Sequence, residues 1–192
     1  MNGFDEAFAR FFASLQQSAG GFWSPFFYAI TLMGNYGVFF IAVSLVLLIF
    51  KKTRKSGAVA LFAIILGFLI GNLLLKNVVA RPRPFIDTTT DYHAWWQAAG
   101  SLSESSYSFP SGHTTIAAAF GVSLFLSYPK KWSWSFLLLP LLMGASRIYF
   151  MVHYASDVFG GILVGGLAAV AAYYLVRWMI HFPRIKKMLP DE

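Results

Sequence analysis

Hydrophobic residues gather along the chain into stretches of about twenty, and short polar segments separate these stretches. A helix needs about twenty predominantly apolar residues to cross the hydrocarbon core of a bilayer. The pattern therefore predicts five membrane-spanning helices, at residues 28–50, 57–79, 112–128, 133–152 and 156–179. We expect an all-α fold, a polytopic bundle of transmembrane helices that forms a single integral-membrane domain over residues 1–192.

A different pattern precedes the first of these spans. Apolar residues recur there at helical spacing while charged residues occupy the rest of the helix circumference; the apolar residues are Phe4, Phe8, Phe11, Phe12 and Leu15. This amphipathic pattern predicts a sixth helix that lies in the membrane interface rather than across the membrane. The sequence Gly-Asn-Tyr-Gly at 34–37 is expected to kink or break the first span.

Composition supports a membrane protein and narrows its partners. Hydrophobic residues make up 57% of the chain and charged residues only 12%, about half the charged share of a typical soluble domain. The net charge of +7 comes from short basic clusters between apolar runs, so we expect membrane lipids and not nucleic acid as partners. The chain has no cysteine, which excludes disulfides and thiolate metal sites. Nothing in the sequence specifies an oligomeric state.

The basic clusters also predict how the bundle is oriented. They follow the first, third and fifth spans, and comprise Lys51, Lys52, Arg54, Lys55, Lys130, Lys131, Arg177, Arg184, Lys186 and Lys187. Loops rich in lysine and arginine stay in the cytoplasm. We therefore expect a cytoplasmic C-terminus. The connections that follow the second and fourth spans are expected to face outside.

Three polar motifs stand at the ends of spans. They are K-x6-RP at 76–84, PSGH at 110–113 and SR-x5-H-x3-D at 146–157. The first closes the second span, the second opens the third span, and the last joins the fourth and fifth spans. All three are therefore expected to meet at the outer face of the bundle. Charged groups at a membrane boundary are costly, which favours a functional site.

The cations in these motifs are suited to holding a phosphate. Arg83 and Arg147 can each donate forked, charge-assisted hydrogen bonds to phosphate oxygens, and Lys76 adds a point charge. Ser111 follows a helix-stopping proline and can donate its hydroxyl, while Gly112 lets backbone N–H groups approach an anion. These five residues are the predicted phosphate-binding set.

The remaining polar residues are suited to attack on that phosphate. His153 and Asp157 are four residues apart and share a face on a helical turn. A carboxylate that holds one imidazole nitrogen leaves the other nitrogen free as a nucleophile, so His153 and Asp157 are predicted as catalytic residues. His113 is predicted to protonate the leaving oxygen.

Each of these features has a simpler explanation when it is taken alone. A basic residue near a span end is usually a snorkelling anchor, and Pro-Ser-Gly is an ordinary helix start. The glycines at 160, 161, 165 and 166 are expected to allow close helix packing and not to bind phosphate. The three motifs in order and on one face outweigh the simpler explanations.

Together the motifs resemble the signature of the type 2 phosphatidic acid phosphatase superfamily, over about residues 35–178. The resemblance implies a phosphohistidine intermediate on His153, oriented by Asp157, with His113 as general acid. It also implies a phosphate cradle made of Lys76, Arg83, Ser111, Gly112 and Arg147, and activity without a metal or another cofactor. Arg81 also precedes a proline, but its spacing from Lys76 differs from the motif and it ranks second.

The resemblance implies hydrolysis of a lipid phosphate, with the site at the outer face of a bacterial plasma or inner membrane. Undecaprenyl pyrophosphate, phosphatidylglycerophosphate, lipid A and phosphatidic acid are the candidate substrates. A phosphotransferase that passes the phosphoryl group to another lipid remains an alternative. A lipid or anion transporter is an alternative of another class, although transport favours charges near the bilayer midplane. The loop carboxylates Asp87, Asp91 and Glu104 show no metal-ligand spacing, so we expect no metal site.

Overall fold

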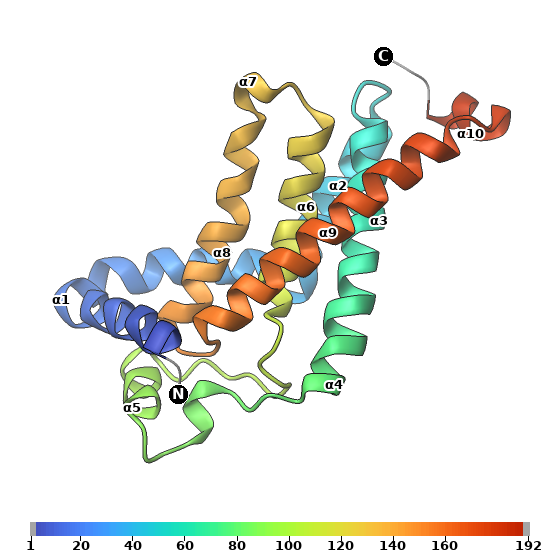
Figure 1. Ribbon diagram of the computed structural model, residues 1–192. Helices are drawn as coiled ribbons and strands as arrows, with labels where there is room; N and C mark the ends of the chain where they lie inside the picture. The colour runs from blue at the N-terminus through green and yellow to red at the C-terminus, as the bar shows by residue number, and fades with distance from the viewer. Residues whose placement is uncertain (1–2, 190–192) are drawn as a thin grey trace.

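The computed structural model describes residues 3–189. Within the last helix, the side chains at 184, 186 and 187 lie outside that description. The described residues form helices and connecting loops without a strand, which confirms the expected all-α membrane fold (Figure 1). In chain order the elements are α1 Gly3–Gly34, η1 Asn35–Gly37, α2 Val38–Ile49, α3 Arg54–Gly67, η2 Phe68–Leu75, α4 Lys76–Val79, η3 Pro84–Ile86, α5 Asp91–Ala98, α6 Gly112–Ser127, α7 Lys130–Ser133, η4 Trp134–Leu137, α8 Leu138–Tyr149, α9 Ala155–Met179 and α10 Pro183–Met188.

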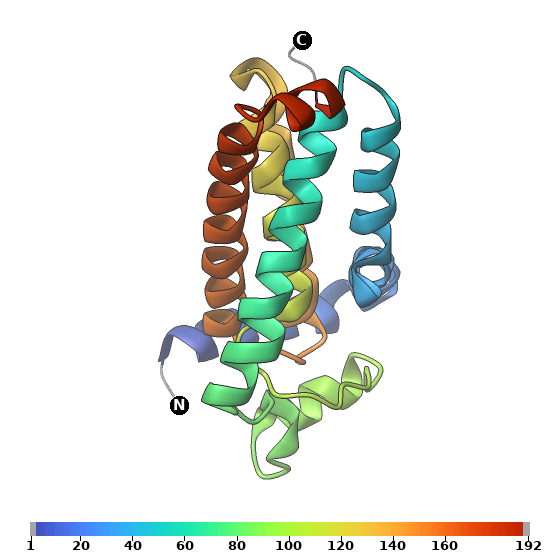
Figure 2. The ribbon, with the colours of Figure 1, turned by 90° about the vertical axis from the view of Figure 1, so that its right-hand side faces the viewer.

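The bundle itself consists of α2, α3, α6, α8 and α9, which pack side by side (Figures 1 and 2). The expected spans at 112–128 and 156–179 coincide with α6 and α9, and the span at 57–79 is the continuous helical run of α3, η2 and α4. By length and composition, three described segments suffice to cross a membrane, namely Gly3–Ile49, Arg54–Ile86 and Ala155–Met179. Gly112–Ser127 is a shorter apolar helix.

The expected fourth span at 133–152 has different bounds in the structure. It starts as the short turns α7 and η4, and α8 ends at Tyr149 instead of continuing to residue 152. Met151 adopts a positive φ of 52°, which a continuing helix does not allow. The chain therefore turns before His153 and delivers this residue to the end of the bundle.

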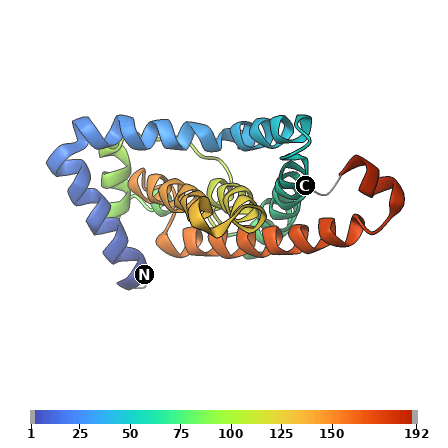
Figure 3. The ribbon, with the colours of Figure 1, turned by 90° about the horizontal axis from the view of Figure 1, so that it is seen from above.

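The first span also begins later than the hydrophobic pattern predicts. Residues 28–34 belong to α1, which bends at Ala19 and lies across the end of the bundle instead of running along it (Figures 1 and 3). The predicted break at 34–37 is confirmed: η1 interrupts the helix there, with positive φ at Tyr36 and Gly37, and α2 then runs along the bundle. The expected apolar face of α1 is buried only in part: Phe12 is buried with Ala9 and Ala13 where α1 packs against α8, whereas Phe4 and Phe11 are exposed.

Small residues hold α6 and α9 close together. A Cβ at Gly161 would lie 2.8 Å from the Ser111 carbonyl oxygen, and one at Gly165 would collide with the Thr115 carbonyl. The packing role expected for these two glycines is therefore confirmed, whereas a Cβ at Gly166 meets no described atom within 4 Å. Because the two helices approach this closely, the start of α6 lies beside the start of α9.

The same end of the bundle receives all three motifs. It gathers α4, the start of α6, the end of α8 and the start of α9, and the loop that carries α5 closes it from below in the view of Figure 1. The turn between α2 and α3, together with α7 and α10, lies at the opposite end. The basic clusters and the polar motifs thus occupy opposite ends of the molecule.

Candidate active site

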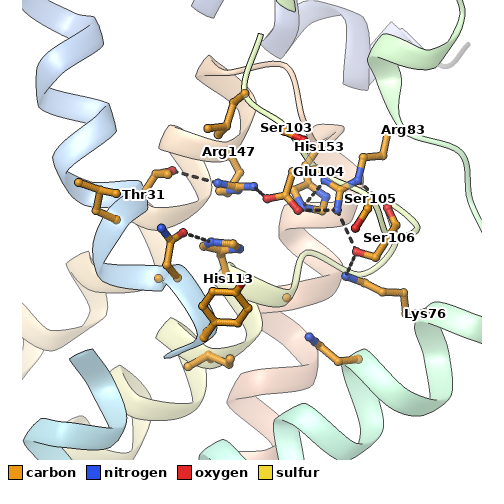
Figure 4. A pocket seen from close by; sticks show the side chains of 18 of the residues that line it. Thr31, Lys76, Arg83, Ser103, Glu104, Ser105, Ser106, His113, Arg147 and His153 are labelled. Carbon is orange, nitrogen blue, oxygen red and sulfur yellow. Dashed lines mark hydrogen bonds and ion pairs between the residues drawn. The ribbon is translucent and has the colours of Figure 1, made fainter. Parts of the chain in front are cut away.

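A cavity of about 530 Å³ lies at this end of the bundle (Figure 4). Six of the eight predicted site residues line the cavity, namely Lys76, Arg83, Gly112, His113, Arg147 and His153. The other two, Ser111 and Asp157, are fully buried behind its wall. The structure therefore brings the three motifs together around one space.

Arg83 and Arg147 both donate hydrogen bonds to oxygen atoms of the protein. Arg83 donates from Nε to the Ser106 carbonyl oxygen at 2.6 Å and from Nη1 to the Val152 carbonyl oxygen at 2.8 Å. Arg147, which is 0% exposed, donates from Nη1 to Thr31 Oγ1 of α1 at 3.1 Å. These bonds fix both guanidinium planes before any ligand arrives, which is the preorganisation that charge stabilisation requires.

Glu104 lies between the two arginines, a position that the sequence did not reveal. Its Oε2 accepts from Arg83 Nη2 at 3.2 Å, and its Oε1 accepts from Arg147 Nη2 (Figure 4). Ser106 of the same loop accepts from Lys76 Nζ at 3.2 Å. Sequence spacing placed Glu104 in an outer loop without a role. The loop lies between the first two motifs in the sequence, and its return to the site was the one signal that could have indicated a role for Glu104.

His153 occupies the turn between α8 and α9 and is 1% exposed. Its Nε2 lies 3.3 Å from Arg83 Nη1, and its Nδ1 lies 3.6 Å from Asp157 Oδ2. Because a guanidinium can only donate, the Nε2 lone pair accepts from Arg83 and Nδ1 carries the proton; at 3.6 Å from Asp157, Nδ1 makes no hydrogen bond to the carboxylate. Burial lowers the pKa of His153 well below its ordinary value, and Arg83 and Arg147 lower it further. The imidazole is therefore neutral, the form that acts as a nucleophile.

Asp157 is held firmly by three donors in addition to its contact with the histidine. Its Oδ2 accepts from the Tyr154 backbone N–H at 2.9 Å and from the Ser108 hydroxyl, and its Oδ1 accepts from Arg81 Nη1 at 2.7 Å. The first of these bonds caps the start of α9, so the geometry that begins this helix also aims the carboxylate.

Arg81 links the Asp157 carboxylate to α1. Sequence spacing ranked Arg81 second to Arg83 and did not predict this connection. It donates from Nη2 to Asp5 Oδ2 at 2.9 Å and from Nη1 to Ser156 Oγ at 2.7 Å. Its guanidinium stacks on the ring of Tyr154 at 3.8 Å from the centroid. Asp5 in turn accepts from the Ser156 backbone N–H at 2.7 Å. An N-terminal residue thus belongs to the chain of contacts that ends at the histidine.

His113 lies in the first turn of α6 and faces the cavity (Figure 4). Its Nε2 lies 3.2 Å from Asn35 Oδ1 of η1, so the amide oxygen holds a proton on that nitrogen. Gly34 leaves room for the ring, because a Cβ there would overlap His113 Cδ2. The break between α1 and α2 therefore also positions the predicted general acid.

Ser111 and Gly112 start α6 without placing a hydroxyl in the cavity. The Ser111 N–H donates to the Asp157 carbonyl oxygen at 3.0 Å, and its Oγ accepts from Thr114 Oγ1 at 2.9 Å. Gly112 lets the Asn72 amide approach, since a Cβ would lie 2.9 Å from Asn72 Nδ2. Donation of the Ser111 hydroxyl to a phosphate remains a prediction.

These features agree with the family to which the chain is related. Residues 56–180 match the PAP2 superfamily, and the chain belongs to this family. An undecaprenyl-diphosphatase from Sulfolobus acidocaldarius is 33% identical over 139 residues, which make up 71% of this chain and 64% of that protein. Undecaprenyl-diphosphatase BcrC from Bacillus subtilis is 36% identical over 129 residues, which make up 65% of this chain and 62% of the relative. The chain spans less than two thirds of the length of these two relatives.

Solved structures have the same architecture. A transmembrane PAP2-type phosphatidylglycerolphosphate phosphatase from Bacillus subtilis superimposes with a TM-score of 0.70 and 26% identity, covering 93% of this chain and 87% of that one. LpxE from Aquifex aeolicus superimposes with a TM-score of 0.65 and 25% identity, covering 86% of this chain and 93% of that one. The chain is therefore an integral membrane protein with the PAP2 fold.

Proposed function

We propose that the protein hydrolyses a phosphate monoester or diphosphate of a membrane lipid through a phosphohistidine on His153. The observation that carries this proposal is the placement of His153, which lines the same cavity as Lys76, Arg83 and Arg147 and has its Nε2 3.3 Å from Arg83 Nη1. These three cations can take the charge on the equatorial oxygens of a transferring phosphoryl group. A buried neutral imidazole beside them has the lone pair that in-line attack requires.

In the first step, His153 Nε2 attacks phosphorus, a P–N bond forms, and the bond from phosphorus to the leaving oxygen breaks. For this step His113 is protonated on both ring nitrogens; it passes one proton to that oxygen and becomes neutral, so the lipid alcohol, or the lipid monophosphate from a diphosphate, departs neutral at this position. Asp157 stabilises the imidazolium character that develops on His153, because its carboxylate lies beside Nδ1.

In the second step, water attacks the phosphohistidine. His113 takes a proton from this water, the P–N bond breaks, and inorganic phosphate leaves with His153 neutral again. The two arginines remain in place through both steps, since their positions are fixed by protein oxygens. The site is then ready for another substrate.

The cavity has an apolar side that suits a lipid substrate. Tyr28, Leu32, Tyr36 and Phe68 line it, and all four are substantially exposed on the surface of the bundle. The relatives named above act, by their names, on undecaprenyl diphosphate and phosphatidylglycerolphosphate, and both are lipid phosphates. We infer the same substrate class here, with the site at the outer face because the basic clusters lie at the opposite end.

The test is phosphate release by the purified full chain from undecaprenyl diphosphate, phosphatidylglycerophosphate and phosphatidic acid, each with EDTA and with and without a lipid alcohol acceptor. We expect release in EDTA and inhibition by orthovanadate, which adopts the five-coordinate shape of the transition state. Transfer to the acceptor in place of release would instead identify a phosphotransferase. Activity that EDTA abolishes and magnesium restores would contradict the assignment of the three cations.

A further inference from the structure

One short piece of the outer loop, residues 104–106, accepts hydrogen bonds from every cation of the phosphate cradle. Glu104 accepts from Arg83 and Arg147, and Ser106 accepts from Arg83 and Lys76 (Figure 4). At least one N–H donor of each cation is therefore already taken by atoms of the protein itself, while Arg147 Nε has no hydrogen-bond partner.

Among the described residues that line the cavity, Glu104 alone carries a carboxylate. A carboxylate that bridges two guanidinium groups presents two oxygen acceptors much as a phosphate edge does. A phosphoryl group seeks the same N–H donors, and two anions at this distance repel each other in a site shielded from water. Glu104 and a bound phosphate are therefore mutually exclusive at Arg83 and Arg147.

Glu104 has a route out of the site. Its side chain is 20% exposed, and it stands in a stretch between α5 and α6 that forms no regular secondary structure. A segment with few backbone hydrogen bonds of its own belongs to the low-stability part of a fold and can move without opening the bundle. Glu104 can therefore leave through rotation of its side chain and a small movement of the loop around it, while the Ser106 carbonyl keeps its bond to Arg83 Nε.

We propose that Glu104 is a built-in counter-ion that an incoming phosphate must displace, so that only anions that bind the cations strongly can occupy this site. The proposal rests on the phosphate cradle of the proposed function. A phosphate monoester or a diphosphate carries about two or more negative charges and gains more from the cations than the carboxylate loses. A phosphodiester headgroup carries one charge, so it exchanges one monovalent anion for another and gains nothing. Ordinary membrane phospholipids, which are phosphodiesters, are thereby kept from occupying the site.

Competition of this kind makes a quantitative prediction. Removing the competitor strengthens the binding of every anion that has to displace it, and by the same factor. In Glu104→Gln the shape of the side chain is kept and its charge is lost. We expect the Kd of inorganic phosphate to fall about tenfold or more, the factor equivalent to one hydrogen bond to a charged group. The Kd of dimethyl phosphate, a phosphodiester monoanion, should fall by a similar factor.

The experiment is isothermal titration of the detergent-solubilised full chain with inorganic phosphate and, separately, with dimethyl phosphate. Glu6→Gln is the matched control, because Glu6 pairs with Arg10 on the exposed surface of α1 and does not line the cavity. It should leave both dissociation constants unchanged. An unchanged or raised Kd of inorganic phosphate in Glu104→Gln would overturn the proposal, because Glu104 would then support the cradle.

A second variant guards against loss of the fold through two uncompensated arginines. Glu104→Asp keeps the charge but is shorter by one methylene, so it bridges the arginines poorly and should lower the Kd of phosphate by a smaller factor. An unchanged or raised Kd in this variant counts equally against the proposal. Failure of the proposed function looks different: the unaltered chain would neither bind phosphate nor release it from lipids.

Discussion

Arg81 connects α1 to the catalytic carboxylate, and replacing it is an informative perturbation of this site. Arg81→Ala removes the ion pairs to Asp157 at 2.7 Å and to Asp5 at 2.9 Å. These two carboxylates are 0% and 1% exposed, whereas the arginine side chain is 28% exposed. Asp157 and Asp5 therefore each lose one ion-pair partner inside the protein.

The expected loss of stability follows from the burial of these two carboxylates. Removing one partner of a buried ion pair costs about 3–5 kcal/mol, and water that enters the space vacated by a partly exposed arginine reduces this to about 2–4 kcal/mol. For a chain of this length the melting temperature should fall by roughly 5–15 °C. Because Asp157 then loses its alignment with His153 Nδ1, kcat should fall about a hundredfold. KM should change little, since Arg81 does not line the cavity.

The assay is kcat and KM for lipid phosphate hydrolysis, together with thermal unfolding in detergent. Arg81→Lys keeps the charge but reaches only one of the two carboxylates, so it should restore part of the stability and part of kcat. Asp5→Asn should reproduce a smaller loss in kcat, because Asp5 anchors the far side of the guanidinium. A fall in melting temperature with an unchanged kcat would refute the positioning role. A raised KM would mean that Arg81 contacts the substrate.

Three further predictions concern packing, protonation and sidedness. Gly165→Ala forces α6 and α9 apart and should lower stability by about 1–3 kcal/mol in thermal unfolding, whereas the adjacent Gly166→Ala should be neutral or stabilising by up to about 1 kcal/mol. The pKa of His153 is lowered in the folded chain. At a pH below the ordinary pKa of 6.5, His153 therefore binds a proton in the unfolded chain but not in the folded chain. Melting temperature should therefore fall from pH 7 to pH 5, and His153→Ala should show a shallower fall; an equal fall in both would contradict the shift. Since the chain has no cysteine, a cysteine at Asp91 should react with an impermeant thiol reagent in intact cells and one at Lys130 should not, while the reverse pattern would place the site in the cytoplasm.

The long apolar runs were the most predictable part of the fold. The bounds expected for the third and fifth spans coincide with α6 and α9, because proline or polar residues stand at the ends of each run. The first span was misplaced because residues 28–34 are apolar and suit either a span or a helix that lies across the bundle end. Hydropathy measures the preference for lipid and carries no information on the direction of a helix.

In the site, motif spacing predicted the cluster but not its supports. The gathering of the three motifs follows from helix order alone. Glu104 and Asp5, by contrast, reach the site through the tertiary paths of a loop and of the N-terminal helix. Asp5 looked like part of a polar helix face, and it is buried because it meets Arg81 and the start of α9. Contacts between residues this far apart in sequence leave no periodic signal, so only the folded chain reveals them.

Trapping the phosphoenzyme shows whether His153 carries the phosphoryl group during turnover. The full chain is mixed with a lipid phosphate that carries a radiolabelled phosphorus, quenched within one turnover, and digested to locate the label. We expect label on His153 that is stable in alkali and lost in acid, as a P–N bond requires. His93→Ala is the control, because His93 bonds to the Phe85 carbonyl away from the cavity, and it should retain the label. Label that persists in His153→Ala, or that maps to another residue, would contradict the mechanism.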